Sequence, residues 1–143
     1  MAIKSPYYSV LQYSLDGTTW NNLTTSTSET LNVGEKVYIR GKQSGNIIDG
    51  SNANKFLLTT GSFAVKGNIM HLYDYEHPDA TSITYNYAFR ALFNGCTALV
   101  DASKLLLPAT TMGLGSYFAM FGGCSLLAAS PELPATTLSN QCY

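Results

Sequence analysis

The feature that most constrains the fold is an internal repeat in the last third of the chain. The segments Phe89–Leu99 and Tyr117–Leu127 share the pattern aromatic-x-x-[Leu/Met]-Phe-x-Gly-Cys-[Thr/Ser]-x-Leu. Every position recurs at the same step, from Phe93 to Phe121 as from Cys96 to Cys124. Because stacked structural units of about 20–50 residues give periodicity of this length, the sequence predicts a solenoid.

A second block follows each copy of the first. The motif Leu-Pro-Ala-Thr-Thr-[Met/Leu] occurs at Leu107–Met112 and again at Leu133–Leu138. We call Phe89–Met112 the first repeat and Tyr117–Leu138 the second. Tyr143 stands as far after Pro134 as Tyr117 stands after Pro108, so a third repeat is expected to begin at Tyr143 and to be truncated.

One such repeat cannot bury its apolar side alone, and stacking on its neighbour makes a continuous core. Each repeat is predicted to hold a short helical turn, a Gly-Cys corner and an extended segment that ends at Leu-Pro. Parallel strands are expected near Leu99–Leu107 and Leu127–Leu133, each ended by a proline that cannot donate to a ladder. The predicted repeat core comprises Phe93, Cys96, Leu99, Leu107, Phe121, Cys124, Leu127 and Leu133.

These positions resemble the leucine-rich repeats of the BspA type, whose pattern is roughly Ala-Phe-x-x-Cys-x-x-Leu-x-x-[Val/Ala]-x-[Leu/Ile]-Pro. The residues that match are Phe93, Cys96, Leu99, Ala102, Leu107 and Pro108, then Phe121, Cys124, Leu127, Leu133 and Pro134. The first repeat carries a short insertion between Leu99 and Leu107. The resemblance implies a surface protein that binds other proteins or cells, with no catalytic residues.

Short strand-like segments fill residues 1–72. Asp16-Gly17 is a strong hairpin signal, and Val37 and Ile39 alternate with polar neighbours as in a strand with one buried face. Six or seven such segments predict a small β-sandwich that serves as an attachment domain. The stretches Tyr13–Trp20 and Gly34–Gly41 resemble the β-rich module that precedes such repeats in proteins of gut Bacteroidetes and their phages.

The predicted fold is therefore mainly β, with a small N-terminal β-sandwich followed by the first two units of a leucine-rich-repeat solenoid with short helical turns. Three parts are expected: the β-sandwich over 1–72, a linker and solenoid cap over 73–88, and the repeats over 89–143. Asn86–Phe93 is predicted to form the first helical piece, and Asn68–Leu72 a strand.

Charge and length exclude several classes of protein. Charged residues make up 12% of the chain and the net charge is −1, which gives no electrostatic basis for binding nucleic acid. No apolar run approaches the ~20 residues of a membrane span. The N-terminus lacks the apolar segment of a signal peptide. The chain is thus expected to be either a trimmed form of an exported protein or a phage structural protein released by lysis.

No residues assemble into a recognisable catalytic, cofactor or metal site. The stretch His71–Asp79 holds both histidines and three acids, which can ligate metals, but a polar linker explains the composition equally well. Cys96 with a histidine could act as a nucleophile. Since Cys96 recurs as Cys124, packing explains it better, and we expect both thiols to be buried, reduced and free of metal, with a disulfide between them as the alternative.

Exposed tyrosine and threonine are the most plausible binding surface, although no particular ligand follows from the sequence. Two functions remain. The first is a non-enzymatic binding or adhesion module on a cell surface or secreted, which contacts a protein or glycan. The second is a structural protein of a phage virion, such as a head or tail fibre, which contacts other virion proteins. The open end of the solenoid is expected to fray or to self-associate, because four core residues lack a covering repeat.

Overall fold

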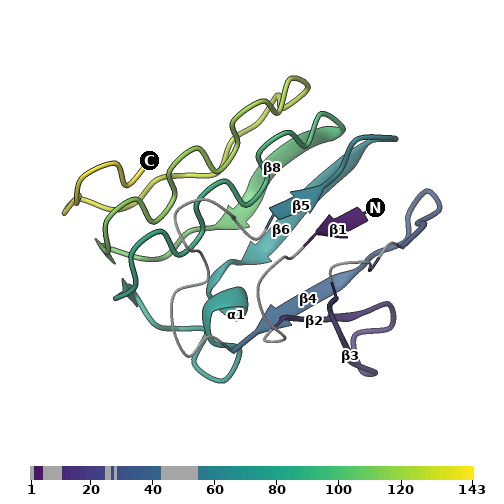
Figure 1. Ribbon diagram of the computed structural model, residues 1–143, viewed down its shortest axis with the longest axis horizontal. Helices are drawn as coiled ribbons and strands as arrows, with labels where there is room; N and C mark the ends of the chain where they lie inside the picture. The colour runs from purple at the N-terminus through teal and green to yellow at the C-terminus, as the bar shows by residue number, and fades with distance from the viewer. Residues whose placement is uncertain (1, 5–10, 25–26, 28, 43–54) are drawn as a thin grey trace.

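The computed structural model describes residues 2–4, 11–24, 27, 29–42 and 55–143. It is mainly β, with one short helix (Figure 1). The elements are β1 (Ala2–Lys4), β2 (Leu11–Ser14), β3 (Asn21–Asn22), β4 (Tyr38–Gly41), β5 (Lys55–Leu57), β6 (Phe63–Asn68), α1 (Met70–Tyr73), β7 (Ser82–Ile83), β8 (Leu99–Leu106) and β9 (Thr111–Met112).

The N-terminal part forms two small antiparallel sheets. Strand β2 pairs with β3 on one side and β4 on the other, and β1 pairs with β5. The hairpin predicted at Asp16-Gly17 is confirmed as the β2–β3 connection. Asp16 holds it, because its Oδ1 accepts the backbone N–H groups of Thr18 and Thr19, both at 2.7 Å. The sequence also predicts a second hairpin, with Thr30–Val33 and Lys36–Gly41 joined at Gly34-Glu35, but this prediction is wrong, because Thr30–Val33 forms no strand and β4 pairs with β2.

The β-sandwich predicted over residues 1–72 does not form within the described residues. Strand β6, which the prediction included in that sandwich, runs parallel to β8 of the first repeat, with Phe63 opposite Leu99 and Asn68 opposite Leu106. The predicted strand Asn68–Leu72 is also wrong. Asn68 Oδ1 accepts the Met70 N–H at 2.9 Å and so turns the chain into α1. Alternating apolar residues do not reveal which strand will be the partner.

The first predicted repeat strand is confirmed as β8, whereas the second is reduced to a single bridge. Asp101 and Ala129 form a parallel bridge, and the Ala128 N–H donates to the Val100 carbonyl at 2.9 Å. The chain then reaches Pro131, which has no N–H to continue the ladder. Parallel bonding therefore links β6, β8 and the start of the second repeat's extended segment in that order (Figure 1).

The helix predicted over Asn86–Phe93 is wrong, because this segment is a run of turns that bonds sideways to the second repeat. Alternate N–H groups from residue 87 to residue 95 donate to alternate carbonyls from residue 114 to residue 122 at 2.6–2.9 Å. The pairs are Tyr87 to Leu114, Phe89 to Ser116, Ala91 to Phe118, Phe93 to Met120 and Gly95 to Gly122. Figure 1 shows the two segments as wavy lines running side by side.

Left-handed backbone conformations prevent the helix. Ala91 and Ala119, which hold equivalent positions in the two repeats, have φ of 55° and 52°, and the equivalent Gly95 and Gly123 have 79° and 71°. A residue at positive φ interrupts the succession of right-handed residues that an α-helix needs. The periodicity of the sequence is thus also a periodicity of backbone conformation.

A third parallel contact joins β7 to β9, with Ser82 opposite Thr111 and Ile83 opposite Met112. Residues 73–88, predicted to be a linker and cap, therefore contribute a strand and core residues such as Ile83 and Ala88. One hydrophobic cluster runs from Leu11 through both repeats to Cys142. Packing is continuous across the predicted boundary at residue 72, where the rings of Phe56 and Phe93 lie 5.6 Å apart.

Candidate functional site

Two surfaces of the stacked repeats are candidates for binding: one side of the stack and its C-terminal end. The side surface carries hydroxyl groups. Because β7 and β9 are in register, Ser82 lies beside Thr111 and Thr81 beside Thr110. The Thr110 hydroxyl donates to the Thr81 carbonyl at 3.4 Å. The second Thr pair of the repeat motif continues the series, and all six side chains are exposed. We call Thr81, Ser82, Thr110, Thr111, Thr136 and Thr137 the hydroxyl face.

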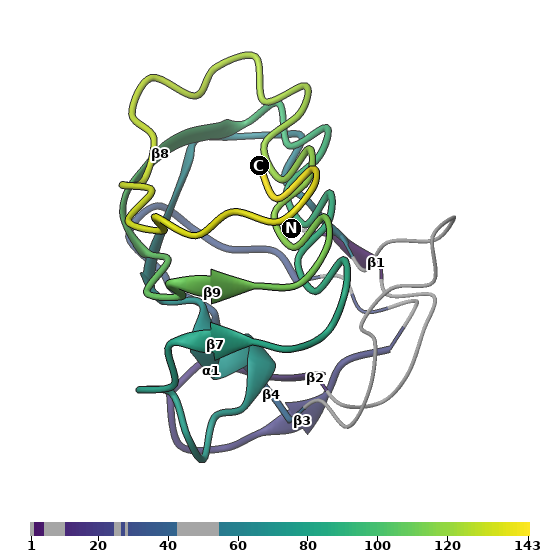
Figure 2. The same ribbon diagram turned by 90° about the vertical axis from the view of Figure 1, so that its left-hand side faces the viewer.

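The last row of this face, Thr136 and Thr137, is held in place by bonds from the segment that follows it. The Ser139 hydroxyl donates to the Gly113 carbonyl at 2.8 Å, and the Gly115 N–H donates to the Asn140 carbonyl at 3.0 Å. Figure 2 looks onto this side, where β7, β9 and the yellow C-terminal segment follow one another up the stack. Neighbouring strands of a sheet lie about 4.8 Å apart, so β7 and β9 present their hydroxyls at about this spacing.

The end surface is the side of the second repeat that faces away from the first. We call Phe121, Cys124, Leu127 and Leu133 the open face. Their counterparts in the first repeat are buried: Phe93 is 4% exposed, Cys96 and Leu99 are 0% and Leu107 is 3%. Leu133 is 55% exposed, and the other three are half-buried. The predicted core residues of the first repeat are therefore buried, whereas those of the second repeat are half-buried or exposed.

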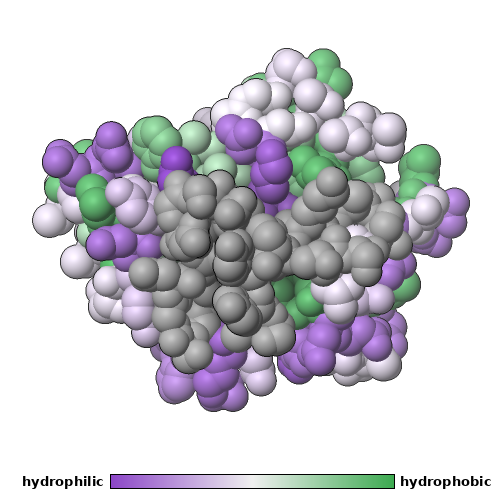
Figure 3. All heavy atoms as spheres, in the orientation of Figure 1, coloured by the Kyte–Doolittle hydropathy of each residue, from purple (hydrophilic) through white to green (hydrophobic). Residues whose placement is uncertain are grey.

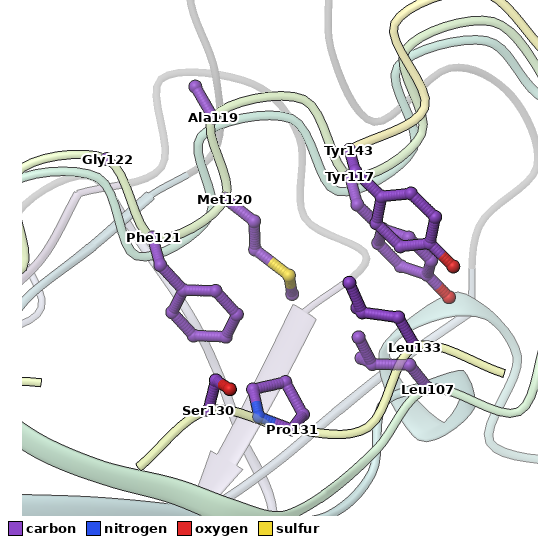
Figure 4. A pocket seen from close by; sticks show the side chains of 10 residues that line it. All are labelled: Leu107, Tyr117, Ala119, Met120, Phe121, Gly122, Ser130, Pro131, Leu133 and Tyr143. Atoms are coloured by element: carbon purple, nitrogen blue, oxygen red, sulfur yellow. The ribbon is translucent and has the colours of Figure 1, made fainter. Parts of the chain in front are cut away.

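A hollow of about 320 Å³ opens at this end. Its ten lining residues are uncharged, and Figure 4 shows Met120, Phe121, Pro131 and Leu133 around it. Figure 3 shows mostly white and green atoms at the upper right, where Figure 1 places one end of the second repeat, with hydrophilic atoms at the left, the top centre, the right edge and the bottom. The hollow at the end of the stack is therefore uncharged and largely apolar.

Aromatic rings form two columns that run through the repeats to this end. Phe93 stacks on Phe121 with 5.5 Å between ring centroids and 8° between planes. In the second column Tyr117 lies between Phe89, at 5.7 Å, and Tyr143, at 5.8 Å. Tyr143 thereby covers one corner of the second repeat, and the Tyr117 N–H donates to the Cys142 carbonyl at 2.9 Å. Among the described residues, no aromatic ring stacks on the outer side of Phe121 as Tyr143 stacks on Tyr117.

A second, larger hollow of about 720 Å³ lies between β4 and β6. At its edge the guanidinium carbon of Arg40 lies 4.0 Å from the ring centroid of Trp20 and 4.3 Å from that of Tyr75. The Arg40 Nε–H also donates to Gln12 Oε1 at 2.9 Å. These contacts join the N-terminal sheet to the segment after α1. Sequence reasoning missed them, because no spacing signal connects Trp20, Arg40 and Tyr75.

The tyrosine clusters considered as a binding surface are partly structural. Tyr73 contacts the rings of Tyr85 and Phe89 at 5.8 and 6.3 Å, and its hydroxyl lies 3.0 Å from that of Thr84. Tyr85 and Tyr87 are half-buried. Tyr7 and Tyr8 lie outside the described residues. The five threonines of the hydroxyl face, in contrast, are all exposed.

The histidine-rich stretch forms a small surface network. His77 Nδ1 lies 2.8 Å from Asp74 Oδ2, and Lys42 forms a salt bridge with Glu76. Among the described residues no group of three His, Cys, Asp or Glu side chains is arranged to hold a metal ion. The hydrogen bond and charge of Asp74 raise the pKa of His77, and the same contact lowers the pKa of Asp74.

We expect Asp74→Asn to lower the pKa of His77 toward its usual value of about 6.5. The introduced amide oxygen can still accept the Glu76 N–H, which Asp74 Oδ1 accepts at 3.0 Å, so the turn is kept while the charge is lost. The raised His77 pKa contributes stability below about pH 6.5 that is lost as the pH rises through the folded value, and the lowered Asp74 pKa contributes stability above about pH 4. Proton NMR titration of the His77 ring measures the shift. An unchanged pKa in the variant would contradict the pairing.

The cysteines are free thiols in packed positions. The Cys96 thiol donates to the Phe56 carbonyl at 2.9 Å, and burial raises the pKa of Cys96 to about 11. Cys124 is half-buried, and burial raises its pKa as well. Since the thiolate is the reactive form, neither residue is suited to act as a nucleophile near neutral pH. Cys96 and Cys124 lie at equivalent positions of successive repeats and are not bonded to each other, and the predicted burial holds for Cys96 but is wrong for Cys124, which is only half-buried because no further repeat covers it among the described residues.

We therefore expect slow alkylation of Cys96 and Cys124 by iodoacetamide at about pH 8 in the folded protein, with Cys96 the slower because it is fully buried. Unfolding in urea should make all three cysteines react rapidly. Mass spectrometry of peptides after timed quenching gives the rate at each position. Rapid native labelling of Cys96, or a bridge between Cys96 and Cys124, would show that packing does not explain the repeated cysteine.

No protein-family model, curated protein or solved structure matches this chain. The resemblance to BspA-type repeats accordingly depends on the matched positions alone. Within the described residues, no helix has the length and apolar character needed to cross a membrane.

Proposed function

We propose that this chain is a non-enzymatic binding or adhesion module, built as the start of a leucine-rich-repeat solenoid of the BspA type, and that the hydroxyl face contacts the ligand. The observation that supports the proposal is the parallel bonding of successive segments at three places around the stack: β6 with β8, β7 with β9, and the turn segments with each other. In repeat proteins of this kind, stacking creates an extended surface for recognition.

The chemistry of the hydroxyl face suits a glycan. Each Ser or Thr hydroxyl both donates and accepts hydrogen bonds, as sugar hydroxyls do. The face carries no charged residue among its six members, so a neutral ligand would meet no cost of desolvating an ion. The alternative of a virion structural protein would use the same stack, with the N-terminal strands attached to the particle.

The proposal is tested by measuring binding of the full chain to immobilised intestinal mucin and, as a protein ligand, to immobilised fibronectin. Thr111→Glu places a charge in the middle of the hydroxyl face and is expected to weaken binding by about 10-fold or more. The matched control is Ser103→Glu, at an exposed position of β8 outside the face. If the chain binds neither mucin nor fibronectin, or if Thr111→Glu and Ser103→Glu weaken binding equally, the proposed role of the hydroxyl face is contradicted.

A further inference from the structure

We propose that two copies of the chain associate through their open faces, end to end, around a two-fold axis. This inference goes beyond the proposed ligand binding and does not depend on it, since the hydroxyl face lies on the side of the stack. It starts from the difference in burial between equivalent residues. Met112 is 7% exposed, and Leu138, its counterpart in the second repeat, is 57% exposed. Ala98 is 3% exposed, and its counterpart Leu126 is 58% exposed.

The contact between the two repeats shows what kind of surface covers such residues. Phe121 covers Phe93 as a ring stacked almost in parallel, and Tyr117 covers Phe89 in the same way. The covering surface is thus uncharged, aromatic and aliphatic, and comes from a repeat of the same sequence pattern. The open face of a second copy has this composition, because it includes Phe121, Leu127 and Leu133.

The other end of the stack does not present an equivalent surface. Phe56, Leu58 and Ile69, which lie in the first row, are 5%, 3% and 2% exposed and belong to the same cluster as Leu11 and Leu23 of the N-terminal part. A head-to-tail contact would require this buried row to open. Contact between two C-terminal ends requires no rearrangement, so the symmetric arrangement is favoured and closes at two copies.

Charge and shape also favour a second copy. From Leu105 to Tyr143 the only Asp, Glu, Lys or Arg is Glu132, so two such ends approach without a field of like charges. One corner of the end is covered, because Tyr143 stacks on Tyr117, whereas Leu133 is 55% exposed and Phe121 is half-buried (Figure 4). A two-fold axis would place the covered corner of each copy against the exposed part of the other.

Sedimentation equilibrium of the full chain over a range of concentrations tests the proposal. The expected result is a reversible change from monomer to dimer, with no larger species. Leu133→Lys should raise the dissociation constant by about 10-fold or more, because it places a charge in the apolar contact. Leu106→Lys is the matched control, since Leu106 is 58% exposed on the outer side of β8 and Leu133 is 55% exposed.

Circular dichroism and urea unfolding of dilute samples establish that both variants fold, as expected for substitutions at exposed positions. A chain that stays monomeric at every concentration, a Leu133→Lys variant that still forms dimers, or growth into open-ended oligomers would each overturn the proposal. The mucin and fibronectin assay is unaffected by these outcomes, because a monomeric Leu133→Lys variant keeps its hydroxyl face. The two proposals can therefore fail separately.

Discussion

Phe89→Ala is expected to lower the free energy of unfolding by about 3–5 kcal/mol, the usual cost of removing a buried phenylalanine ring. Phe89 is 1% exposed and lies between Tyr73 on one side and Tyr117 on the other, with ring centroids 6.3 and 5.7 Å away. Its loss would leave a cavity where residues before the first repeat meet the second repeat. Since small domains are stable by only about 5–15 kcal/mol, this is a large fraction of the total.

Urea denaturation followed by tyrosine and tryptophan fluorescence measures the change. Leu106→Ala is the control, because Leu106 is 58% exposed and its removal should alter stability by less than about 0.5 kcal/mol. A cost below about 1 kcal/mol for Phe89→Ala would mean that the aromatic column does not stabilise the stack. Both variants are compared below the concentration at which the chain associates, so that dimer formation does not contribute to the measured free energy.

The periodicity of the sequence was sufficient to predict β8 and the burial of the first repeat. Because Phe93, Cys96, Leu99 and Leu107 recur at a regular spacing, their burial in the stack follows from the pattern without knowledge of the pairing. The same argument predicted that the counterparts in the second repeat would lack cover, and Leu133 at 55% exposure agrees with it. Spacing identifies which residues face the same way in successive repeats.

Local backbone conformation could not be predicted in the same way. Tyr87 and Ala91 have φ of 58° and 55°, values that few residues other than glycine adopt, so ordinary propensities favoured a helix here. Tertiary bonding overrides the propensity, because the N–H groups of these two residues donate to the carbonyls of Leu114 and Phe118 at 2.6 and 2.9 Å. The turn ladder exists only when two repeats are adjacent, and one repeat read alone gives no sign of it.

The sequence predicted which residue types form the candidate site, but it did not predict all of their positions. The sequence predicts exposed threonine as part of the binding surface, and the Thr pairs after Pro108 and Pro134 are exposed in the structure. The row at Thr81 and Ser82 was missed, since the Leu-Pro part of the motif is absent before it. Only the register of β7 against β9 reveals that these residues align.

Tyr117→Phe is expected to raise the free energy of unfolding by about 1–3 kcal/mol, the usual penalty of a buried polar group without a partner. Tyr117 is 2% exposed, and its hydroxyl is the one buried side-chain N or O atom among the described residues that lacks a hydrogen-bond partner. The same burial raises the pKa of Tyr117, since ionisation would place a charge where water cannot solvate it. The equivalent position of the first repeat, Phe89, already holds a phenylalanine in a stacked geometry.

Tyr73→Phe is the matched control, because the Tyr73 hydroxyl lies 3.0 Å from the Thr84 hydroxyl and accepts the Thr84 N–H at 3.2 Å. This variant removes the same atom from a residue that uses it and should be less stable by about 0.5–1.5 kcal/mol. Urea unfolding of the two variants and the parent, in dilute solution, should thus give changes of opposite sign. If Tyr117→Phe is destabilised as much as Tyr73→Phe, the Tyr117 hydroxyl forms a hydrogen bond in solution, for example with a bound water molecule, and the prediction is wrong.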